Sequence, residues 1–202
     1  MRIALIVDEV RKILNVYAKT YYKMGVAEGV PHDMQDGEID NEGWVKWKII
    51  PSHVSVAEVE DIEKKYNFIL PPYLSGYLRA CYQKFDQVVS RRYNDQLIFM
   101  SDCPSDNPLG PLTSIVNSWS PLLDARYFPI AEWGDCWGPM CLDLESSSTE
   151  PNDYNIVWFD HDEIISLGEE ACSERNQIHS YAKPLYDSFK EFFFDVFESK
   201  RS

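Results

Sequence analysis

The amino-acid sequence predicts an α+β fold, with an antiparallel sheet of about four to six strands and helices packed on one face or one end. The first observation is a group of three short apolar runs between residues 128 and 159, rich in the aromatic and β-branched residues that strands favour. Their short loops cannot join parallel neighbours, because a parallel crossover needs about a dozen residues or more. The second observation is that runs with helical periodicity precede and follow this group, an order typical of the α+β class.

Composition limits the classes of partner. The chain has 202 residues, 45% of them hydrophobic, and a formal net charge of −14 at pH 7. Nucleic acids and anionic membrane surfaces both attract clustered Lys and Arg, so we expect neither as a partner. A basic protein is the expected partner, because opposite fields steer association. Solubility alone is the other explanation of the acidity.

The cysteines and the N-terminal run bear on the compartment. The five cysteines are odd in number and include no C-x-x-C pair, which favours reduced thiols over a disulfide framework or a zinc site. Asp8 and Glu9 interrupt the run MRIALIV before it reaches the length of a signal peptide. No stretch approaches the roughly 20 apolar residues of a membrane span. We therefore expect a cytoplasmic protein, although a domain cut from a larger protein would look the same.

The N-terminal part is predicted as an extension, with residues 1–43 forming a helix and an acidic linker and residues 44–202 forming the α+β domain. Over residues 2–24 apolar side chains recur at three- and four-residue steps, which is typical of an amphipathic helix. Residues 25–43 are rich in Gly and acidic residues and predict a loop. The apolar stripe of the helix either packs on its own domain, which we favour, or forms a homodimer contact.

A helix pair is predicted after a strand at residues 44–50. Ser55 and Glu58 have the spacing of a capping box at the start of the first helix. The sequence ILPP ends that helix, because a residue before proline avoids the helical region. Pro72 can then serve as the first residue of a second helix, which we expect to run to about Gln83.

The rest of the chain alternates between strands and helices. QLIFM at residues 96–100 predicts a strand, and residues 112–124 predict a short helix that Pro121 limits. The sheet runs follow as FPIA, PMCLDL and IVWF, with the turn WGDCWG between the first two. Residues 164–179 are expected to be irregular or weakly helical. A strongly amphipathic helix over residues 181–198 is predicted to end the chain.

Negative charge is concentrated in the part of the sequence that is predicted to form the sheet. Between Tyr127 and Glu174 there are 12 Asp and Glu residues and no Lys or Arg. Two Trp residues flank the WGDCWG turn, and aromatic side chains with a charged surround are typical of an interface hot spot. Each Trp could instead cover the core. The residues predicted to contact a partner are Trp133, Asp135, Trp137, Asp143, Asp160 and Asp162.

The densest polar cluster is Asp160–Glu163, which follows the last of the three apolar runs. Together with Asp135, Asp143 or His53 it could hold a divalent metal, or His161 could act as a general base. The spacing matches no dedicated metal motif, and neighbours on a strand point to opposite faces, so the four side chains cannot all converge. We therefore favour an exposed turn.

Cys136 and Cys141 are the other candidates for chemistry. A nucleophilic thiol needs a neighbouring base and a lowered pKa, and the spacing of these residues provides evidence of neither. The sequence contains no G-x-S-x-G and no phosphate-binding Gly-rich loop. We predict no catalytic residue, no metal and no cofactor, with a metal-dependent hydrolase as the weaker alternative.

Four segments in order resemble the SUKH superfamily, which includes fungal cell-wall assembly regulators and bacterial immunity proteins. They are VSVAEVEDIEKKYNFILPPYLSGYL, FPIAEWGDCWGPMCLDL, YNIVWFDHDEI and YAKPLYDSFKEFFFDVF. In that family a helix ending in Leu-Pro leads into a second helix, and a hairpin, a strand and a last helix follow. The likeness covers residues 50–198. Pro72 and Tyr73 stand where the family often has an acidic residue and an aromatic one, and residues 1–43 have no counterpart.

This resemblance implies an α+β fold without a catalytic role. It also implies that a bacterial member neutralises a cognate polymorphic toxin, often a nuclease, by direct binding. An acidic surface would suit a basic nuclease, because carboxylates can occupy the place of phosphates. The alternative within the same family is a regulatory or scaffold module of the cell-wall assembly type.

Overall fold

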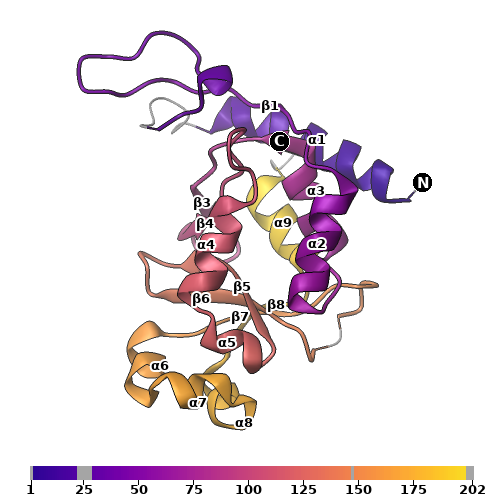
Figure 1. Ribbon diagram of the computed structural model, residues 1–202, viewed down its shortest axis with the longest axis vertical. Helices are drawn as coiled ribbons and strands as arrows, with labels where there is room; N and C mark the ends of the chain where they lie inside the picture. Colours follow the sequence, from indigo (N-terminus) through magenta and orange to yellow (C-terminus); the bar gives the residue numbers. More distant parts are fainter. Residues whose placement is uncertain (1, 22–28, 147, 199–202) are drawn as a thin grey trace.

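A computed structural model describes residues 2–21, 29–146 and 148–198, and it confirms the predicted α+β class (Figure 1). Within these residues, one antiparallel sheet holds six strands, and each is hydrogen-bonded to the next in chain order. Two very short strands, β1 (Ile50–Pro51) and β2 (Cys81–Tyr82), pair separately. The strands of the large sheet are β3 (Gln87–Ser90), β4 (Gln96–Met100), β5 (Tyr127–Trp133), β6 (Gly138–Asp143), β7 (Ile156–Trp158) and β8 (Lys183–Tyr186).

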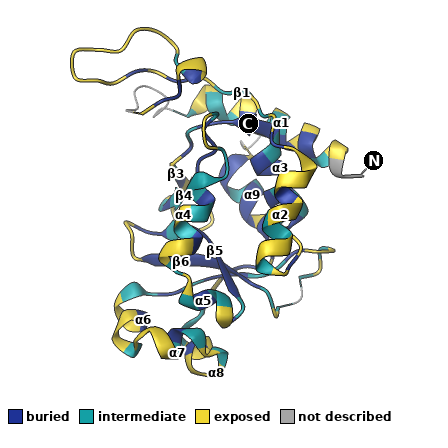
Figure 2. Cartoon of the chain, in the orientation of Figure 1, coloured by how far each residue is buried: buried dark blue, intermediate teal, exposed yellow. Residues whose placement is uncertain are grey.

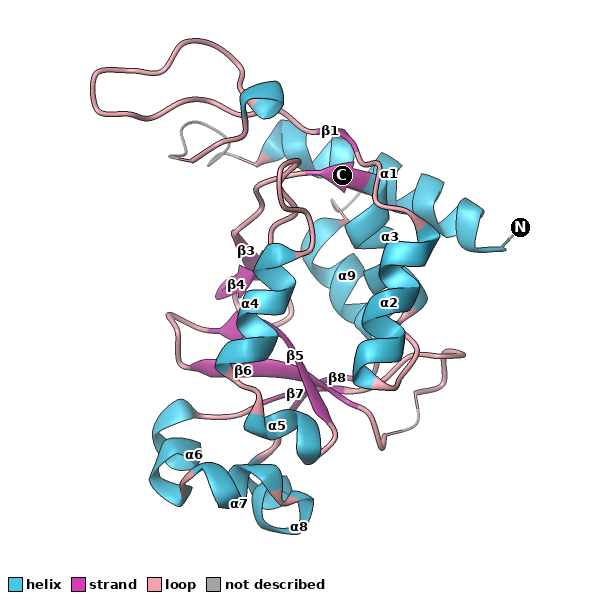
Figure 3. Ribbon diagram, in the orientation of Figure 1, coloured by secondary structure: helices cyan, strands magenta, loops and turns pink. Residues whose placement is uncertain are grey.

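Helices cover both faces of this sheet, as Figure 3 shows. Phe128, Leu142 and Ile156 belong to the main core, on the face covered by α3 and α9. Tyr127 and Cys141 point the other way, into a smaller core with residues of α5 to α8. Because both faces are buried, β5 and β6 are apolar almost throughout. The α-helices are α1 (Arg2–Thr20), α2 (Val56–Tyr66), α3 (Pro72–Ala80), α4 (Gly110–Ser118), α5 (Pro121–Asp124), α6 (His161–Leu167), α7 (Glu169–Ser173), α8 (Arg175–Ile178) and α9 (Phe189–Phe197).

The N-terminal helix packs on its own chain. Val10 and Leu14 are fully buried in the main core, and a Cβ at Gly76 of α3 would lie 3.0 Å from a Val10 methyl group. Tyr73 Oη donates a hydrogen bond to Glu9 across the same contact, at 2.8 Å. The apolar stripe is thus covered within the chain. Helix α1 ends at Thr20, and the last residues of the predicted helix lie outside the described part.

The predicted helix pair is present with its predicted start. Ser55 and Glu58 form the capping box at the start of α2, with Ser55 Oγ accepting from the Glu58 amide at 3.2 Å. Helix α3 begins at Pro72 but ends at Ala80, because Cys81 and Tyr82 form β2. The predicted strand at residues 44–50 is mostly extended chain, of which only Ile50 belongs to β1.

Two other predicted helices are wrong in part. The helix expected over residues 112–124 is divided into α4 and α5, since Pro121 starts a new helix. The helix expected over residues 181–198 begins only at Phe189, because residues 183–186 form β8. Ser188 caps α9 by accepting from the Glu191 amide at 3.0 Å.

Residues 29–43, the described part of the acidic linker, form a projecting loop. A short 3-10 helix (His32–Met34) starts it, and Met34 is fully buried. The chain then leaves the body and returns, closed by a bridge between Gln35 and Trp47. We call residues 36–44 the acidic arm; they are exposed throughout, and Figure 2 shows the arm as the yellow loop at the top of the molecule.

Candidate protein-binding surface

The turn between β5 and β6 is shaped by its glycines. Gly134 and Cys136 have positive φ values of 67° and 57°, and the Trp137 amide donates to the Trp133 carbonyl at 2.9 Å. The Trp137 ring lies directly over Gly134, where a Cβ would come within 2.4 Å of a ring carbon. Only glycine leaves space for the indole there. Trp137 is held in this position with 48% of its surface exposed.

Gly138 joins this turn to the start of α6. Its φ is 143°, and a Cβ there would lie 2.0 Å from the Phe159 carbonyl oxygen. The close approach lets the His161 amide donate to the Trp137 carbonyl at 2.9 Å, and the Phe159 amide to the Pro139 carbonyl at 3.1 Å. The first residues of α6 are therefore fixed beside the turn by backbone hydrogen bonds.

The start of α6 holds the second group of carboxylates. Asp160 is the N-cap, and its Oδ1 accepts from the Asp162 amide at 3.1 Å. Lys183 Nζ, from β8, lies 2.8 Å from Glu163 and 3.6 Å from Asp160, and 4.5 Å from the centre of the Trp158 ring. The hydrogen bond to Glu163 raises the pKa of Lys183 above its usual range, so the charged form of this lysine, which lies between the two acidic side chains, is favoured.

Four of the six predicted contact residues lie together on this surface: Asp135, Trp137, Asp160 and Asp162. Glu132 adds a further carboxylate, which accepts a hydrogen bond from Trp119 Nε1 at 3.4 Å. We define the acidic turn surface as Glu132, Asp135, Trp137, Asp160, Asp162 and Glu163. It presents five carboxylates and one exposed indole, of which Asp160 and Glu163 are the two paired with Lys183.

The other two predicted residues, Trp133 and Asp143, are buried and take no part in this surface. Trp133 is 5% exposed and packs edge-to-face on Tyr93, with ring centres 5.3 Å apart. Asp143 lies at the far end of β6 and pairs with Arg175 at 2.7 Å. Both side chains contribute to the interior.

The charge along the sheet is also less uniform than its sequence implies. Arg175 bonds Asp143 and Glu145, each at 2.7 Å. Lys190 bonds Glu150 at 2.8 Å. These cations lie after the acidic stretch in the sequence, and the fold returns them to it. Part of the negative charge at the far end of β6 and in the loop after it is therefore offset within the fold.

The structure bears differently on each alternative for chemistry. His161 does have a carboxylate beside it, since its Nε2 lies 3.1 Å from Asp162 Oδ1, and its Nδ1 lies 3.0 Å from the Trp137 carbonyl oxygen. In the ranges that the structure describes, no group of three or more His, Cys, Asp and Glu side chains is arranged to hold a metal ion. Cys141 is buried, and burial raises the pKa of its thiol. Cys136 is exposed, and its pKa is raised by desolvation and then by the Glu132 carboxylate, whereas an activated nucleophile has a lowered one.

Comparisons with known proteins leave the family open. No protein-family model matches the chain. A search of curated proteins returned no match either. Among the described helices, none has the length and apolar character that crossing a membrane requires.

Proposed function

We propose that this protein is a non-catalytic binding protein that neutralises a basic toxin domain, most simply a nuclease, by direct contact through the acidic turn surface. The observation that carries the proposal is that five carboxylates and one exposed indole gather on a turn and a helix start that are joined by backbone hydrogen bonds and backed by buried strands. The resemblance to the SUKH superfamily supports the choice of a toxin as the partner.

Rigidity makes the acidic turn surface suited to tight binding. Its backbone is hydrogen-bonded between Trp137 and His161, and it is backed by the buried strands β5 and β6. Ordering a flexible side chain at an interface costs about 0.5–1.5 kcal/mol, and a surface that is already ordered avoids part of that cost. Asp160 and Glu163 are held by Lys183 before any partner arrives.

The chemistry of the surface specifies the partner. A nuclease presents Lys and Arg where it binds phosphates, and the carboxylates of Asp135 and Asp162 can take the place of those phosphates. Opposite charge accelerates the encounter, and the accelerating effect falls as salt is added. Trp137 supplies the apolar anchor that such interfaces commonly place among polar contacts.

Affinity capture followed by an activity assay tests this proposal. The immobilised protein is exposed to a lysate of its source cells at low salt and eluted with rising NaCl. We expect a basic protein at intermediate salt, with a nuclease or other toxic activity that the added protein suppresses at equimolar ratio. A captured protein that keeps its full activity when saturated would contradict neutralisation and favour the regulatory scaffold instead.

A further inference from the structure

A groove of about 470 Å³ lies beside α6, between the corner that joins α4 to α5 and the turn that joins α6 to α7. Trp119, Pro121 and Leu122 line one side, and Ile164 and Ile165 line the other. Its volume is within the range of about 300–1,000 Å³ that binding pockets occupy. The groove is thus large enough to receive several side chains.

The apolar wall of the groove is open to solvent. Ile165 is 64% exposed, although Ile164 beside it is buried in the smaller core. Gly168 ends α6 with a φ of 85°, and a Cβ there would meet nothing within 4 Å. No described part of the chain fills this space, so an apolar side chain from elsewhere can enter it without displacing anything.

The border of the groove is acidic. Of the described residues, Glu169 is the one charged residue that lines it. The two helices α6 and α7 carry Asp162, Glu163, Glu169 and Glu170 and contain no Lys or Arg. An occupant that matches this surface is apolar on one side and basic around it.

The groove is continuous with the acidic turn surface. Asp162 and Ile165 lie three residues apart on α6, so their side chains emerge on the same side, about 4.5 Å apart along the helix axis. On the opposite wall, Trp119 Nε1 donates to Glu132 of the acidic turn surface at 3.4 Å. A partner seated on the turn surface therefore reaches the groove without a gap.

We infer that this groove binds one basic, amphipathic segment of the partner protein, as a second part of the same interface; the inference rests on the proposed function. Apolar side chains of that segment lie between Trp119 and Ile165, and its Lys or Arg residues meet Asp162 and Glu169. A helix that places its apolar face in a hydrophobic groove is a common mode of recognition.

A defined peptide tests the groove without the toxin. The probe is a fluorescein-labelled Leu/Lys helix of about 18 residues, or five turns, compared with a scrambled peptide of equal charge whose leucines do not share one face. Fluorescence anisotropy measures both against the full protein, Ile165→Glu and the control Ile39→Glu. Ile39 is 57% exposed in the acidic arm, so both substitutions replace an exposed isoleucine with a carboxylate.

We expect the amphipathic peptide to bind better than the scrambled one, and Ile165→Glu to weaken it roughly tenfold while Ile39→Glu leaves it unchanged. Because each substitution adds negative charge, a purely electrostatic attraction would strengthen in both variants. The inference would be overturned if Ile165→Glu bound the amphipathic peptide as tightly as the unsubstituted protein does, or if Ile39→Glu lost as much affinity as Ile165→Glu.

If Ile165→Glu still binds and neutralises the captured toxin normally, the groove inference fails while the proposed function stands. If the peptide result holds but no toxin is captured, the proposed function fails instead.

Discussion

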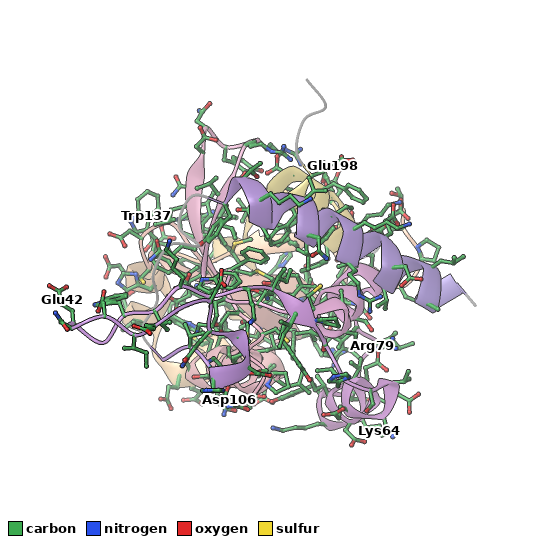
Figure 4. The ribbon with its side chains drawn as sticks, turned by 90° about the horizontal axis from the view of Figure 1, so that it is seen from above. Glu42, Lys64, Arg79, Asp106, Trp137 and Glu198 are labelled. Atoms are coloured by element: carbon green, nitrogen blue, oxygen red, sulfur yellow. The ribbon has the colours of Figure 1, made fainter. Side chains whose placement is uncertain are left out.

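The acidic turn surface and the acidic arm are both rich in carboxylates, but they are attached to the rest of the fold in different ways. Each combines several carboxylates with one exposed tryptophan, Trp137 in the turn surface and Trp44, 40% exposed, in the arm. The turn surface lies on the sheet and includes the start of α6. The arm extends away from the body, and Figure 4 shows Glu42 at its outermost point.

The arm is held together mostly by its own turn. Asp40 Oδ1 accepts from the amides of Glu42 and Trp44, both at 2.9 Å, and the Asp36 amide donates to the Lys46 carbonyl at 2.8 Å. A Cβ at Gly43 would meet no atom within 4 Å, whereas one at Gly138 would meet backbone at 2.0 Å. No described element packs against the tip.

Both regions combine acidic residues with an exposed aromatic side chain, so composition alone does not distinguish them as binding surfaces. The turn surface is joined to α6 by backbone hydrogen bonds and is backed by buried strands, so binding there orders fewer groups than binding at the projecting arm does. We therefore assign binding to the turn surface and expect the arm to contribute little. Three pairs of substitutions compare the two regions directly.

The largest expected effect is on stability, from Gly138→Ala compared with Gly43→Ala. Both positions have positive φ values, 143° and 90°, so both alanines are strained. At Gly138 the new methyl group must also displace the Phe159 backbone, and we expect a loss of about 2–4 kcal/mol in the free energy of unfolding. At Gly43 strain alone costs about 1 kcal/mol. Urea denaturation measures both, and equal losses would mean that the turn and α6 are not fixed by this close approach.

The next effect is on association, from Asp135→Lys with Asp162→Lys. Asp40→Lys with Glu42→Lys is the matched control, because it makes the same change in net charge on the arm. We expect the first pair to slow association with the captured toxin by about tenfold to hundredfold at low salt, and the control to change it far less. The salt dependence should become shallower only in the first pair. Stopped-flow kinetics at two salt concentrations measure both quantities, and equal slowing would indicate that net charge, not position, determines the rate.

The sequence predicts helix boundaries well where a capping residue or a proline sets them. The capping box at Ser55 and the Leu-Pro break before Pro72 fix α2 and α3 within a few residues, and the structure has both. Strand β8 was not predicted, because the sequence KPLY becomes a strand only through its pairing with β7. The start of α9 has a local signal in the Ser188 cap, and it is also held by Asp153, which accepts from the Phe189 amide 36 residues away.

The same limit applies to the site. Composition identified the turn and the α6 start, so four of the six predicted residues lie on one surface. Composition could not show that Trp133 faces the core, nor that Arg175, 32 residues later, would neutralise Asp143. The groove beside α6 was also not predicted, since its two walls come from segments that only the fold brings together. The sequence shows only two adjacent isoleucines, Ile164 and Ile165, after an acidic cluster, and the exposure of Ile165 is known only from the structure.

The smallest expected effect compares two capping aspartates, Asp160→Ala and Asp40→Ala. Asp160 caps α6 and pairs with Lys183, so its loss should lower the free energy of unfolding by about 1 kcal/mol. Asp40 also accepts two backbone hydrogen bonds, yet their loss opens only the arm, and we expect a change in global stability within about 0.5 kcal/mol.

Chemical denaturation followed by tryptophan fluorescence measures the global change, and limited proteolysis between residues 36 and 44 measures the local one. Asp40→Ala should be cut faster at the arm than the unsubstituted protein, while Asp160→Ala should be cut there at an unchanged rate. Asp160→Asn is the control, because an asparagine keeps the cap and loses only the charge paired with Lys183. If Asp40→Ala instead destabilises the whole protein as much as Asp160→Ala does, the arm unfolds with the core, and its carboxylates are as ordered before binding as those of the turn surface.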